Sequence, residues 1–264
     1  MSENAKKALL IDLDGVVYEG GQAVEGAVEA VRWMDDEGVP RLFLTNTTSR
    51  PRSALVEKLS GLGVEAGGDD ILTPPVAAAA WLREHGVGTV APFVPDATAA
   101  EFDAFDRLDG ASEGSVDAVI VGDLGEDWSF ARLNRAFRLL MAEPAPYLVA
   151  LGMTRYWKAP DGLRLDTAPF VVALSHASGV EPVVLGKPAE PFFAAALAKL
   201  GVGVAETVMV GDDLRADVGG AQAAGIDGVL VRTGKYRGEE SAGDIRPAAV
   251  LDSIADLPGW WPGR

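Results

Sequence analysis

The chain has 264 residues, which is enough for one large domain or two modest ones. Its 39 acidic and 23 basic side chains give a formal net charge of −16, which argues against nucleic acid or an anionic membrane as a partner. The absence of cysteine excludes disulfides, thiolate catalysis and cysteine-ligated metal sites. Two histidines leave little material for a catalytic triad or a multi-histidine metal site.

The N-terminal segment predicts a cytoplasmic protein. Residues 1–7 lead into a short apolar stretch that lacks the long apolar core and the cleavage site of a signal peptide. No apolar run in the chain approaches the ~18 to 20 residues that a membrane-spanning helix needs. We therefore expect a soluble protein without a membrane partner.

Strand and helix patterns alternate in the first part of the chain. An apolar run that ends at Asp12 predicts a strand, and it is followed by an expected helix over residues 24–37. A second strand is expected over residues 41–45 and a second helix over residues 51–62. This βαβα order predicts a parallel sheet.

The same alternation returns near the C-terminus and is interrupted in the middle. Beyond Lys187 the pattern predicts, in order, a helix over 191–200, a strand over 207–210, a helix that ends at Ala223 and a strand over 228–231. Residues 78–182 have strand patterns of their own and an amphipathic helix with Leu133, Phe137 and Leu140 on one face. We predict an α/β protein whose Rossmann-like open parallel sheet, residues 1–77 and 183–264, is split by an inserted α/β domain, residues 78–182.

Four short polar clusters stand directly behind apolar runs. They are Asp12-Leu13-Asp14-Gly15, Thr45-Asn46-Thr47, Gly186-Lys187-Pro188 and Gly211-Asp212-Asp213. Each cluster alone is most often a turn or a helix cap. Because the carboxyl ends of parallel strands meet at one edge of a sheet, their conjunction predicts that the clusters converge on one pocket.

The residue types in these clusters suit the transfer of a phosphoryl group. Asp12 is the candidate nucleophile, because a carboxylate at a strand end can attack phosphorus and form an aspartyl phosphate. Asp14 is the candidate general acid and base for the leaving oxygen and the attacking water. Lys187, Thr45 and the amide of Asn46 are candidate ligands of the phosphoryl oxygens.

The acidic residues also predict a metal site. Two ionised carboxylates ~4 Å apart repel by about 4 kcal/mol at an effective dielectric of ~20, and a divalent cation removes that repulsion. Oxygen ligands favour Mg²⁺ over zinc, so Asp12, Asp14 and Asp212 are the candidate metal residues. The roles of Asp213 and Asp217 are left open. Each either orients a residue that contacts the metal or is an acidic residue at the N-terminus of a helix, where it favours the helix dipole.

The clusters resemble the motifs of a known family. The segments IDLDGVVYEG, FLTNTT, LGKP and VGDDLRADVGGAQAAG resemble, in this order, the four motifs of the haloacid dehalogenase superfamily of phosphatases. The insertion between the second and third motifs is similar to the cap domain of subclass IIA of that superfamily. The resemblance implies a Mg²⁺ cofactor, a cap that selects a small phosphorylated substrate, and a homodimer through the cap.

The resemblance also implies roles for individual residues, and they agree with those given above. Asp12 matches the nucleophile, Asp14 the acid and base, and Asp212 the third carboxylate on the metal side. Thr45 and Lys187 match the phosphate-binding pair. The metal contact that the resemblance implies for Asp14 is made by its backbone carbonyl.

A narrower resemblance concerns the substrate. The segments LGMTRYWKAPDGL, LGKPAEPFF and VRTGKYR are similar to those of phospholysine phosphohistidine inorganic pyrophosphate phosphatases. We therefore expect a Mg²⁺-dependent phosphatase of small phosphorylated compounds, with pyrophosphate and phosphoamidates as candidate substrates. Alternatives are a sugar-phosphate or aryl-phosphate phosphatase of the same subclass and, from another class, a phosphoaspartate signalling domain or a non-catalytic phospho-ligand-binding protein.

Overall fold

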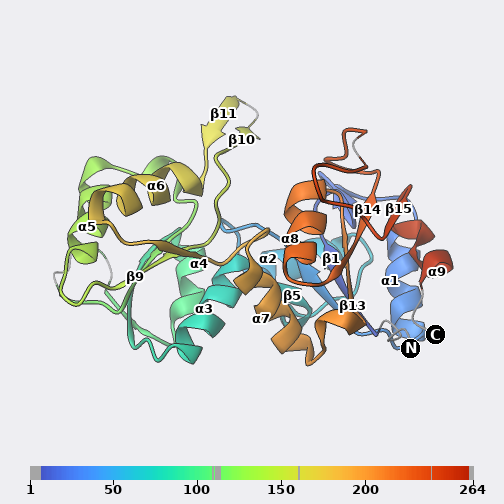
Figure 1. The fold of residues 1–264 in the computed structure, drawn as a ribbon, viewed down its shortest axis with the longest axis horizontal. Coiled ribbons are helices and arrows are strands. Elements are labelled where there is room, and N and C mark those ends of the chain that lie inside the picture. The colour runs from blue at the N-terminus through green and yellow to red at the C-terminus, as the bar shows by residue number, and fades with distance from the viewer. Residues whose placement is uncertain (1–6, 109, 111–113, 160, 239, 262–264) are drawn as a thin grey trace. The chain divides into compact units, whose positions relative to one another are not determined.

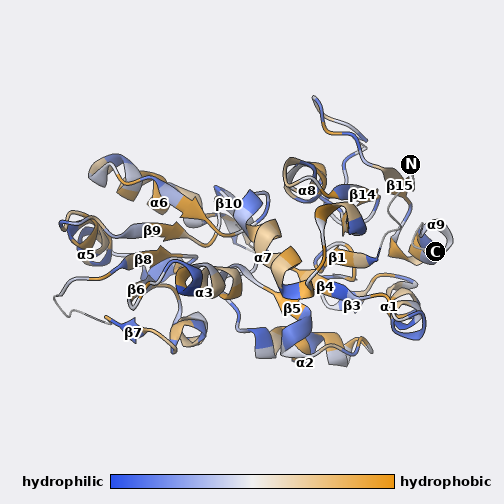
Figure 2. Cartoon of the chain, turned by 60° about the horizontal axis from the view of Figure 1, so that its bottom comes forward, coloured by the Kyte–Doolittle hydropathy of each residue, from blue (hydrophilic) through white to orange (hydrophobic). Residues whose placement is uncertain are grey.

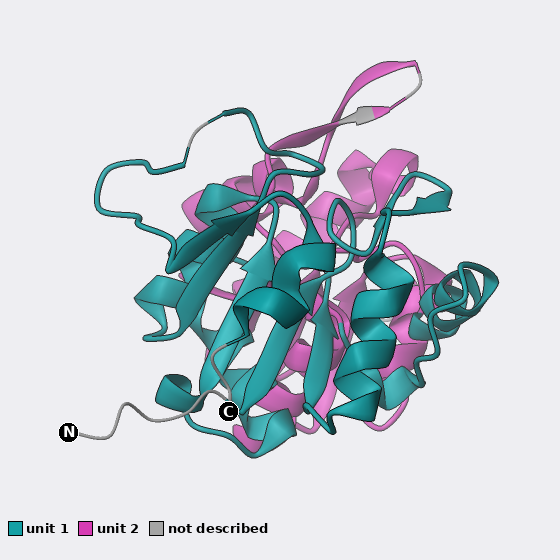
Figure 3. Cartoon of the chain, turned by 90° about the vertical axis from the view of Figure 1, so that its right-hand side faces the viewer, with its two compact units in different colours: residues 1–45, 52–72, 187–264 teal, residues 46–51, 73–186 magenta. Residues whose placement is uncertain are grey.

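The computed structural model describes residues 7–108, 110, 114–159, 161–238 and 240–261. The chain divides into two compact units, which Figure 3 shows in different colours. The first unit consists of Met1–Thr45, Arg52–Leu72 and Lys187–Arg264, and the second of Asn46–Pro51 and Thr73–Gly186. The first unit has the parallel sheet that the alternating sequence pattern predicts, and the second unit has a parallel sheet of its own.

The first unit is built on a parallel sheet with the strand order β15-β14-β13-β1-β4-β5 (Figure 1). Its strands are β1 (Ala8–Asp12), β4 (Arg41–Leu44), β5 (Ile71–Leu72), β13 (Thr207–Gly211), β14 (Asp227–Val231) and β15 (Ala249–Leu251). β1 pairs with β13 on one side and with β4 on the other. Every residue of β1 and β13 is buried, which explains their unbroken apolar runs.

Helices cover both faces of this sheet (Figures 1 and 2). The helices are α1 (Ala27–Asp36), α2 (Arg52–Gly61), α7 (Glu190–Leu200), α8 (Gly220–Ala223) and α9 (Leu257–Trp260). The buried residues of α1 and α2 share one apolar core with Leu9, Ile11 and Phe43 of the strands. On the other face α7 contacts β4 and α8, and α8 contacts β14. This enclosure leaves the strand ends as the place where polar side chains can gather.

Short elements complete the first unit. The strands β2 (Tyr18–Glu19) and β3 (Gln22–Ala23) form a small hairpin after β1. Single 3₁₀ turns cover Gly68–Asp70, Val204–Glu206 and Ile254–Asp256. The helix that the sequence predicts to end at Ala223 begins as a π-helix, Leu214–Gly219, and only its end is α8.

The second unit is a smaller α/β fold with the parallel strand order β12-β9-β8-β6-β7. Its strands are β6 (Thr89–Phe93), β7 (Asp106–Arg107), β8 (Ala118–Val121), β9 (Tyr147–Ala150) and β12 (Pro182–Val184), with a separate hairpin of β10 (Tyr156–Ala159) and β11 (Gly162–Leu165). Its helices are α3 (Pro74–Glu84), α4 (Asp96–Ala99), α5 (Phe130–Leu140) and α6 (Thr167–Ser178), with 3₁₀ turns at Ala100–Phe102 and Gly125–Asp127. Leu133, Phe137 and Leu140 of α5 all pack into its core, as their spacing predicts.

The boundaries between the units differ from those expected from the sequence. A division after residue 77 would cut α3, because Pro74 and Pro75 lie in its first turn and do not end the preceding segment. A division after residue 182 would cut β12, which pairs with β9. Residues 46–51 also belong to the second unit, where the Thr48 hydroxyl accepts a hydrogen bond from the backbone N–H of Asp123.

Among the residues that the structure describes, no helix has the length and apolar character needed to cross a bilayer.

The burial of β13 can be tested with a matched pair of substitutions. Val208 lies fully buried in β13, whereas Val204, in the turn before it, is 42% exposed. Val208→Ala should lower the free energy of unfolding by about 2 kcal/mol, through lost apolar burial and a cavity. Val204→Ala should change it by less than about 0.5 kcal/mol. Urea denaturation followed by circular dichroism measures both, and equal losses would contradict the central place of β13.

Candidate active site

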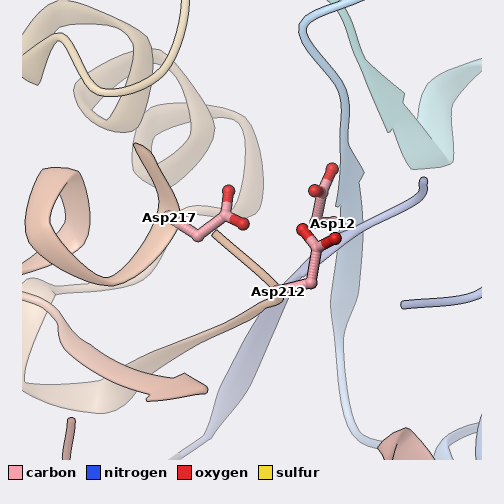
Figure 4. A group of neighbouring side chains, drawn as sticks. All are labelled: Asp12, Asp212 and Asp217. Carbon is pink, nitrogen blue, oxygen red and sulfur yellow. The ribbon is translucent and has the colours of Figure 1, made fainter. Parts of the chain in front are cut away.

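The ends of β1 and β13 bring acidic side chains together at one edge of the first unit's sheet. Asp12 is the last residue of β1, and Asp212 follows the last residue of β13. Asp217 lies on the π-helix that follows β13. The three side chains are buried, and each offers a carboxylate oxygen within 4.8 Å of the others (Figure 4). The parallel pairing of β1 with β13 brings Asp12 and Asp212 together, and the π-helix adds Asp217.

Lys187 brings a positive charge into this acidic group. It stands before α7 and is itself buried, with its Nζ 2.7 Å from Asp12 Oδ1 and 2.7 Å from Asp217 Oδ1. Burial alone would lower the pKa of Lys187, but the charges and hydrogen bonds of Asp12 and Asp217 outweigh burial and raise the pKa above its ordinary value. Lys187 is therefore a permanent cation at the floor of the site.

Asp12 is oriented by the start of its own loop as well as by Lys187. The backbone N–H of Leu13 donates a hydrogen bond to Asp12 Oδ1 over 2.8 Å. The chain turns outward immediately afterwards, so Asp14 is exposed although Asp12 is buried. The two carboxylates of the DxD pair thus differ in environment, one enclosed and one in contact with solvent.

Asp212 is held between two glycines. The backbone N–H of Lys235 donates to Asp212 Oδ2 over 2.6 Å. A Cβ atom added to Gly15 or to Gly234 would lie 2.0 Å from the same oxygen, and both glycines have positive φ angles. Only a residue without a side chain allows the backbone to approach the carboxylate so closely.

The π-helix turns Asp217 back toward the β13 loop. Asp217 Oδ2 accepts a hydrogen bond from the backbone N–H of Asp213 over 3.0 Å. Asp213 has a different task, because its Oδ1 caps the start of the helix by accepting from the N–H groups of Arg215 and Ala216. A Cβ at Gly211 would lie 2.2 Å from the Asp217 Cβ, so this glycine also makes room for a carboxylate.

The buried charges are not balanced by the protein alone. Three carboxylates face one ammonium, and burial together with the charge of Asp12 raises the pKa of Asp212 to about 7. Burial also raises the pKa of Asp217, although Lys187 opposes the effect. Neighbouring negative charges in a place of low dielectric favour protonation or a bound cation.

This donor set fits a magnesium ion. Asp212 Oδ1 is buried and accepts no hydrogen bond within the described chain, so one carboxylate oxygen is available as a ligand. Carboxylate oxygens are hard ligands of the kind that Mg²⁺ prefers. The residues that would hold the ion are Asp12, Asp212 and Asp217.

The structure brings together part of the set of residues predicted from the sequence. Asp12 and Asp212 meet at the ends of neighbouring strands, as predicted. Lys187 also reaches Asp12, although the strand before it, β12, belongs to the sheet of the second unit and not to the sheet that was expected. Thr45 is buried at the end of β4, and its backbone N–H donates to the carbonyl of Leu72 over 3.2 Å.

The remaining predicted residues have other surroundings. The side chain of Asp14 is not part of the buried acidic group, so the metal contact through its backbone carbonyl stays a prediction. Asn46 belongs to the second unit, where its Oδ1 lies near Gly186, and its contact with phosphate also stays a prediction.

Two features of the site were missed at the sequence level. Asp217 was left open, because its place four residues after the helix cap Asp213 does not show that the π-helix turns it back toward the β13 loop. The segment Thr233–Lys235 was used only as part of a resemblance. Its glycine at position 234 is the signal that could have indicated a close backbone approach.

Comparisons with known proteins agree with this arrangement. Residues 9–106 match the family model described as haloacid dehalogenase-like hydrolase, and residues 184–257 match the one described as HAD-hydrolase-like. Phospholysine phosphohistidine inorganic pyrophosphate phosphatase of Homo sapiens is 35% identical to the chain over 255 residues, which is 95% of this chain and 92% of that protein. The chain belongs to the haloacid dehalogenase-like hydrolase family. It is thus an enzyme, a phosphatase of this family.

Other members of the haloacid dehalogenase-like family show the same likeness. Haloacid dehalogenase-like hydrolase domain-containing protein 2 of Bos taurus is 39% identical over 250 residues, which is 95% of this chain and 93% of that protein. Among solved structures, p-nitrophenyl phosphatase from Archaeoglobus fulgidus superposes with a TM-score of 0.86 at 28% identity, over 97% of this chain and 99% of that one. NagD from E. coli K-12 gives a TM-score of 0.85 at 25% identity, over 96% and 98%.

The space that Gly211 leaves for Asp217 predicts a loss of activity on substitution. Gly211→Ala must displace the Asp217 carboxylate by about 1 Å, and such a misplacement costs about a hundredfold in turnover. Gly21→Ala is the matched control, because a Cβ there meets nothing within 4 Å. Hydrolysis of p-nitrophenyl phosphate measures both variants, and circular dichroism checks that they are folded. Full activity of Gly211→Ala would show that the position of Asp217 is unimportant.

The raised pKa of Asp212 predicts how the stability of the metal-free protein depends on pH. Because the carboxyl binds its proton more tightly in the folded chain, the folded state holds more protons, and the free energy of unfolding falls as the pH rises from about 4 to about 7. The fall is at most about 1.4 kcal/mol per pH unit. Asp212→Asn should flatten this dependence in chelator, as should Mg²⁺ with the natural chain. Thermal unfolding at a series of pH values tests it, and an unchanged slope in the variant would contradict the assignment.

Proposed function

We propose that the chain is a Mg²⁺-dependent phosphatase that hydrolyses small phosphorylated compounds through an aspartyl phosphate on Asp12. One observation carries the proposal: Asp12 is buried with its Oδ1 2.7 Å from Lys187 Nζ, inside a group of three carboxylates that fits a divalent cation. A signalling receiver or a plain binding protein has no use for a second carboxylate two residues beyond the nucleophile. The exposed Asp14 therefore favours turnover.

The first half-reaction transfers the phosphoryl group to the protein. An oxygen of Asp12 attacks phosphorus while the bond from phosphorus to the leaving oxygen breaks, and Asp14 gives its proton to that oxygen. Lys187 neutralises the transferred group from the floor of the site, and Thr45 binds one of its oxygens. In the second half-reaction Asp14 takes a proton from water, which attacks phosphorus and releases Asp12 and inorganic phosphate.

The metal would be held by the buried carboxylates Asp12, Asp212 and Asp217. When bound, it supplies positive charge that offsets both these carboxylates and the oxygens of the phosphoryl group. The chain as a whole repels anions because of its charge of −16, so a local positive field is needed for any phosphorylated substrate.

For the substrate we propose pyrophosphate and phosphoamidates first, on the strength of the likeness to the Homo sapiens protein of that name. A general aryl-phosphate phosphatase is the second candidate, favoured by the likeness to the Archaeoglobus fulgidus p-nitrophenyl phosphatase. A homodimer through the second unit, acting as a cap, is proposed from the family resemblance alone.

Replacement of the nucleophile tests the mechanism. Asp12→Asn should lower phosphate release from p-nitrophenyl phosphate and pyrophosphate by at least about a thousandfold, because amide oxygen does not attack phosphorus. Asp36→Asn changes an exposed residue of α1 in the same way and should leave activity unchanged. Phosphate release is measured with Mg²⁺ and with chelator.

The covalent step has its own readout. A radiolabelled substrate, quenched in acid during turnover, should leave label on the natural chain that hydroxylamine removes, as expected for an acyl phosphate, and none on Asp12→Asn. Undiminished turnover in Asp12→Asn would remove the covalent mechanism.

A further inference from the structure

The segment Thr233–Lys235 is anchored beside the acidic group at three points. Thr233 Oγ1 donates to the carbonyl of Gly15 over 2.5 Å, and the backbone N–H of Gly234 donates to Glu19 Oε1 over 2.6 Å. The backbone N–H of Lys235 donates to Asp212 Oδ2 over 2.6 Å. These bonds fix the backbone from which the Lys235 side chain extends.

The ammonium group of Lys235 is not used by the buried site. Its side chain is 61% exposed, and its Nζ lies 3.9 Å from Asp213 Oδ2, at the limit of an ion pair. Asp213 already caps the π-helix with its other oxygen. Burial lowers the pKa of Lys235, but the charges of Asp12 and Asp212 outweigh this and raise it, so the group is cationic at neutral pH.

The site therefore has two ammonium groups at different depths. Lys187 is buried against Asp12, whereas the side chain of Lys235 is exposed and only its backbone N–H bonds to Asp212. In phosphoryl transfer the attacking and leaving oxygens lie roughly in line on opposite sides of phosphorus. Because Asp12 attacks from the buried side, the leaving group departs toward solvent. Asp14 and Lys235 are both exposed, and the loops that carry them touch at Gly15 and Gly234.

We infer that Lys235 is a specificity-determining residue that binds a negatively charged leaving group, such as the second phosphate of a diphosphate. The inference rests on the proposed function for the direction in which the leaving group departs. A compact ammonium on a flexible stem suits a phosphate as a point charge. A neutral leaving group gains nothing from it, so Lys235 favours diphosphates over phosphate esters of uncharged alcohols.

Binding measurements test this assignment without turnover. Isothermal calorimetry in Mg²⁺ compares methylenediphosphonate, a non-hydrolysable diphosphate, with orthophosphate on the natural chain, Lys235→Met and Lys235→Arg. Lys235→Met should weaken methylenediphosphonate about tenfold and orthophosphate less than about twofold, since one charge-assisted contact is lost only with the larger anion. Lys235→Arg should restore most of the difference. Lys199→Met, which removes a charge on α7 that pairs with Asp69, is the control for net charge and should change neither affinity.

Salt and turnover give readouts that a merely structural role would not move. The preference of the natural chain for methylenediphosphonate should shrink as salt rises, and that of Lys235→Met should not. The kcat/KM for pyrophosphate should fall about tenfold in Lys235→Met, while that for a phosphate ester of an uncharged alcohol is kept.

The two possible failures differ. Equal losses for both anions, or no loss for either, would overturn the role of Lys235. Phosphate release that survives Asp12→Asn would overturn the proposed function and leave the binding result standing.

Discussion

The chemistry of this protein depends on one electrostatic constraint: among the described residues, three buried carboxylates share a small space with one buried ammonium, that of Lys187. Asp12, Asp212 and Asp217 come from the ends of two neighbouring strands and the turn after one of them, so the sheet itself forces their approach. Lys187 forms ion pairs with Asp12 and Asp217. The negative charge of Asp212 is not offset by Lys187 in this way. A fold that keeps such a group buried gives up stability in exchange for a strong local preference for cations.

The same constraint explains why backbone atoms, more than side chains, pack around the carboxylates of Asp212 and Asp217. Gly15, Gly211 and Gly234 lie against carboxylates at distances where a Cβ would collide with them. They are far apart in sequence, yet each makes room at one place where loops from β1, β13 and β14 come together. Backbone N–H groups from these loops can then donate directly to the carboxylates, which is how Asp212 and Asp217 are oriented.

Much of the core could be predicted because its strands are buried on both faces. The apolar runs before Asp12 and Asp212 are typical of buried parallel strands. A parallel sheet in turn predicts that the polar residues after these strands lie together. Asp217 could not be assigned, because a spacing of four residues does not reveal whether a helix opens with α or π geometry. The two residues of β5 (Ile71–Leu72) carry too little pattern to be recognised as a strand. The apolar run of β12 (Pro182–Val184) is recognisable, but its pattern does not show that it pairs with β9 of the second unit, and the unit boundaries differ from the expected ones for that reason.

Thr45 and Asn46 illustrate a different limit. They are neighbours in one motif, but the chain passes from the first compact unit to the second between them. A motif read as one functional cluster can therefore span a boundary that its residue types do not indicate. The residue types of a segment indicate which chemistry is available, but they do not indicate which compact unit carries each side chain.

The bond between the N–H of Lys235 and Asp212 has a consequence for how such an enzyme can change over time. Since that bond belongs to the backbone, any residue except proline can replace Lys235 and still hold the carboxylate in place. The side chain at position 235 would select the substrate, whereas the backbone N–H of the same residue orients Asp212. The two functions are thus independent, although one residue provides both. Single substitutions at position 235 could therefore change the preferred substrate during evolution while the catalytic carboxylates keep their positions.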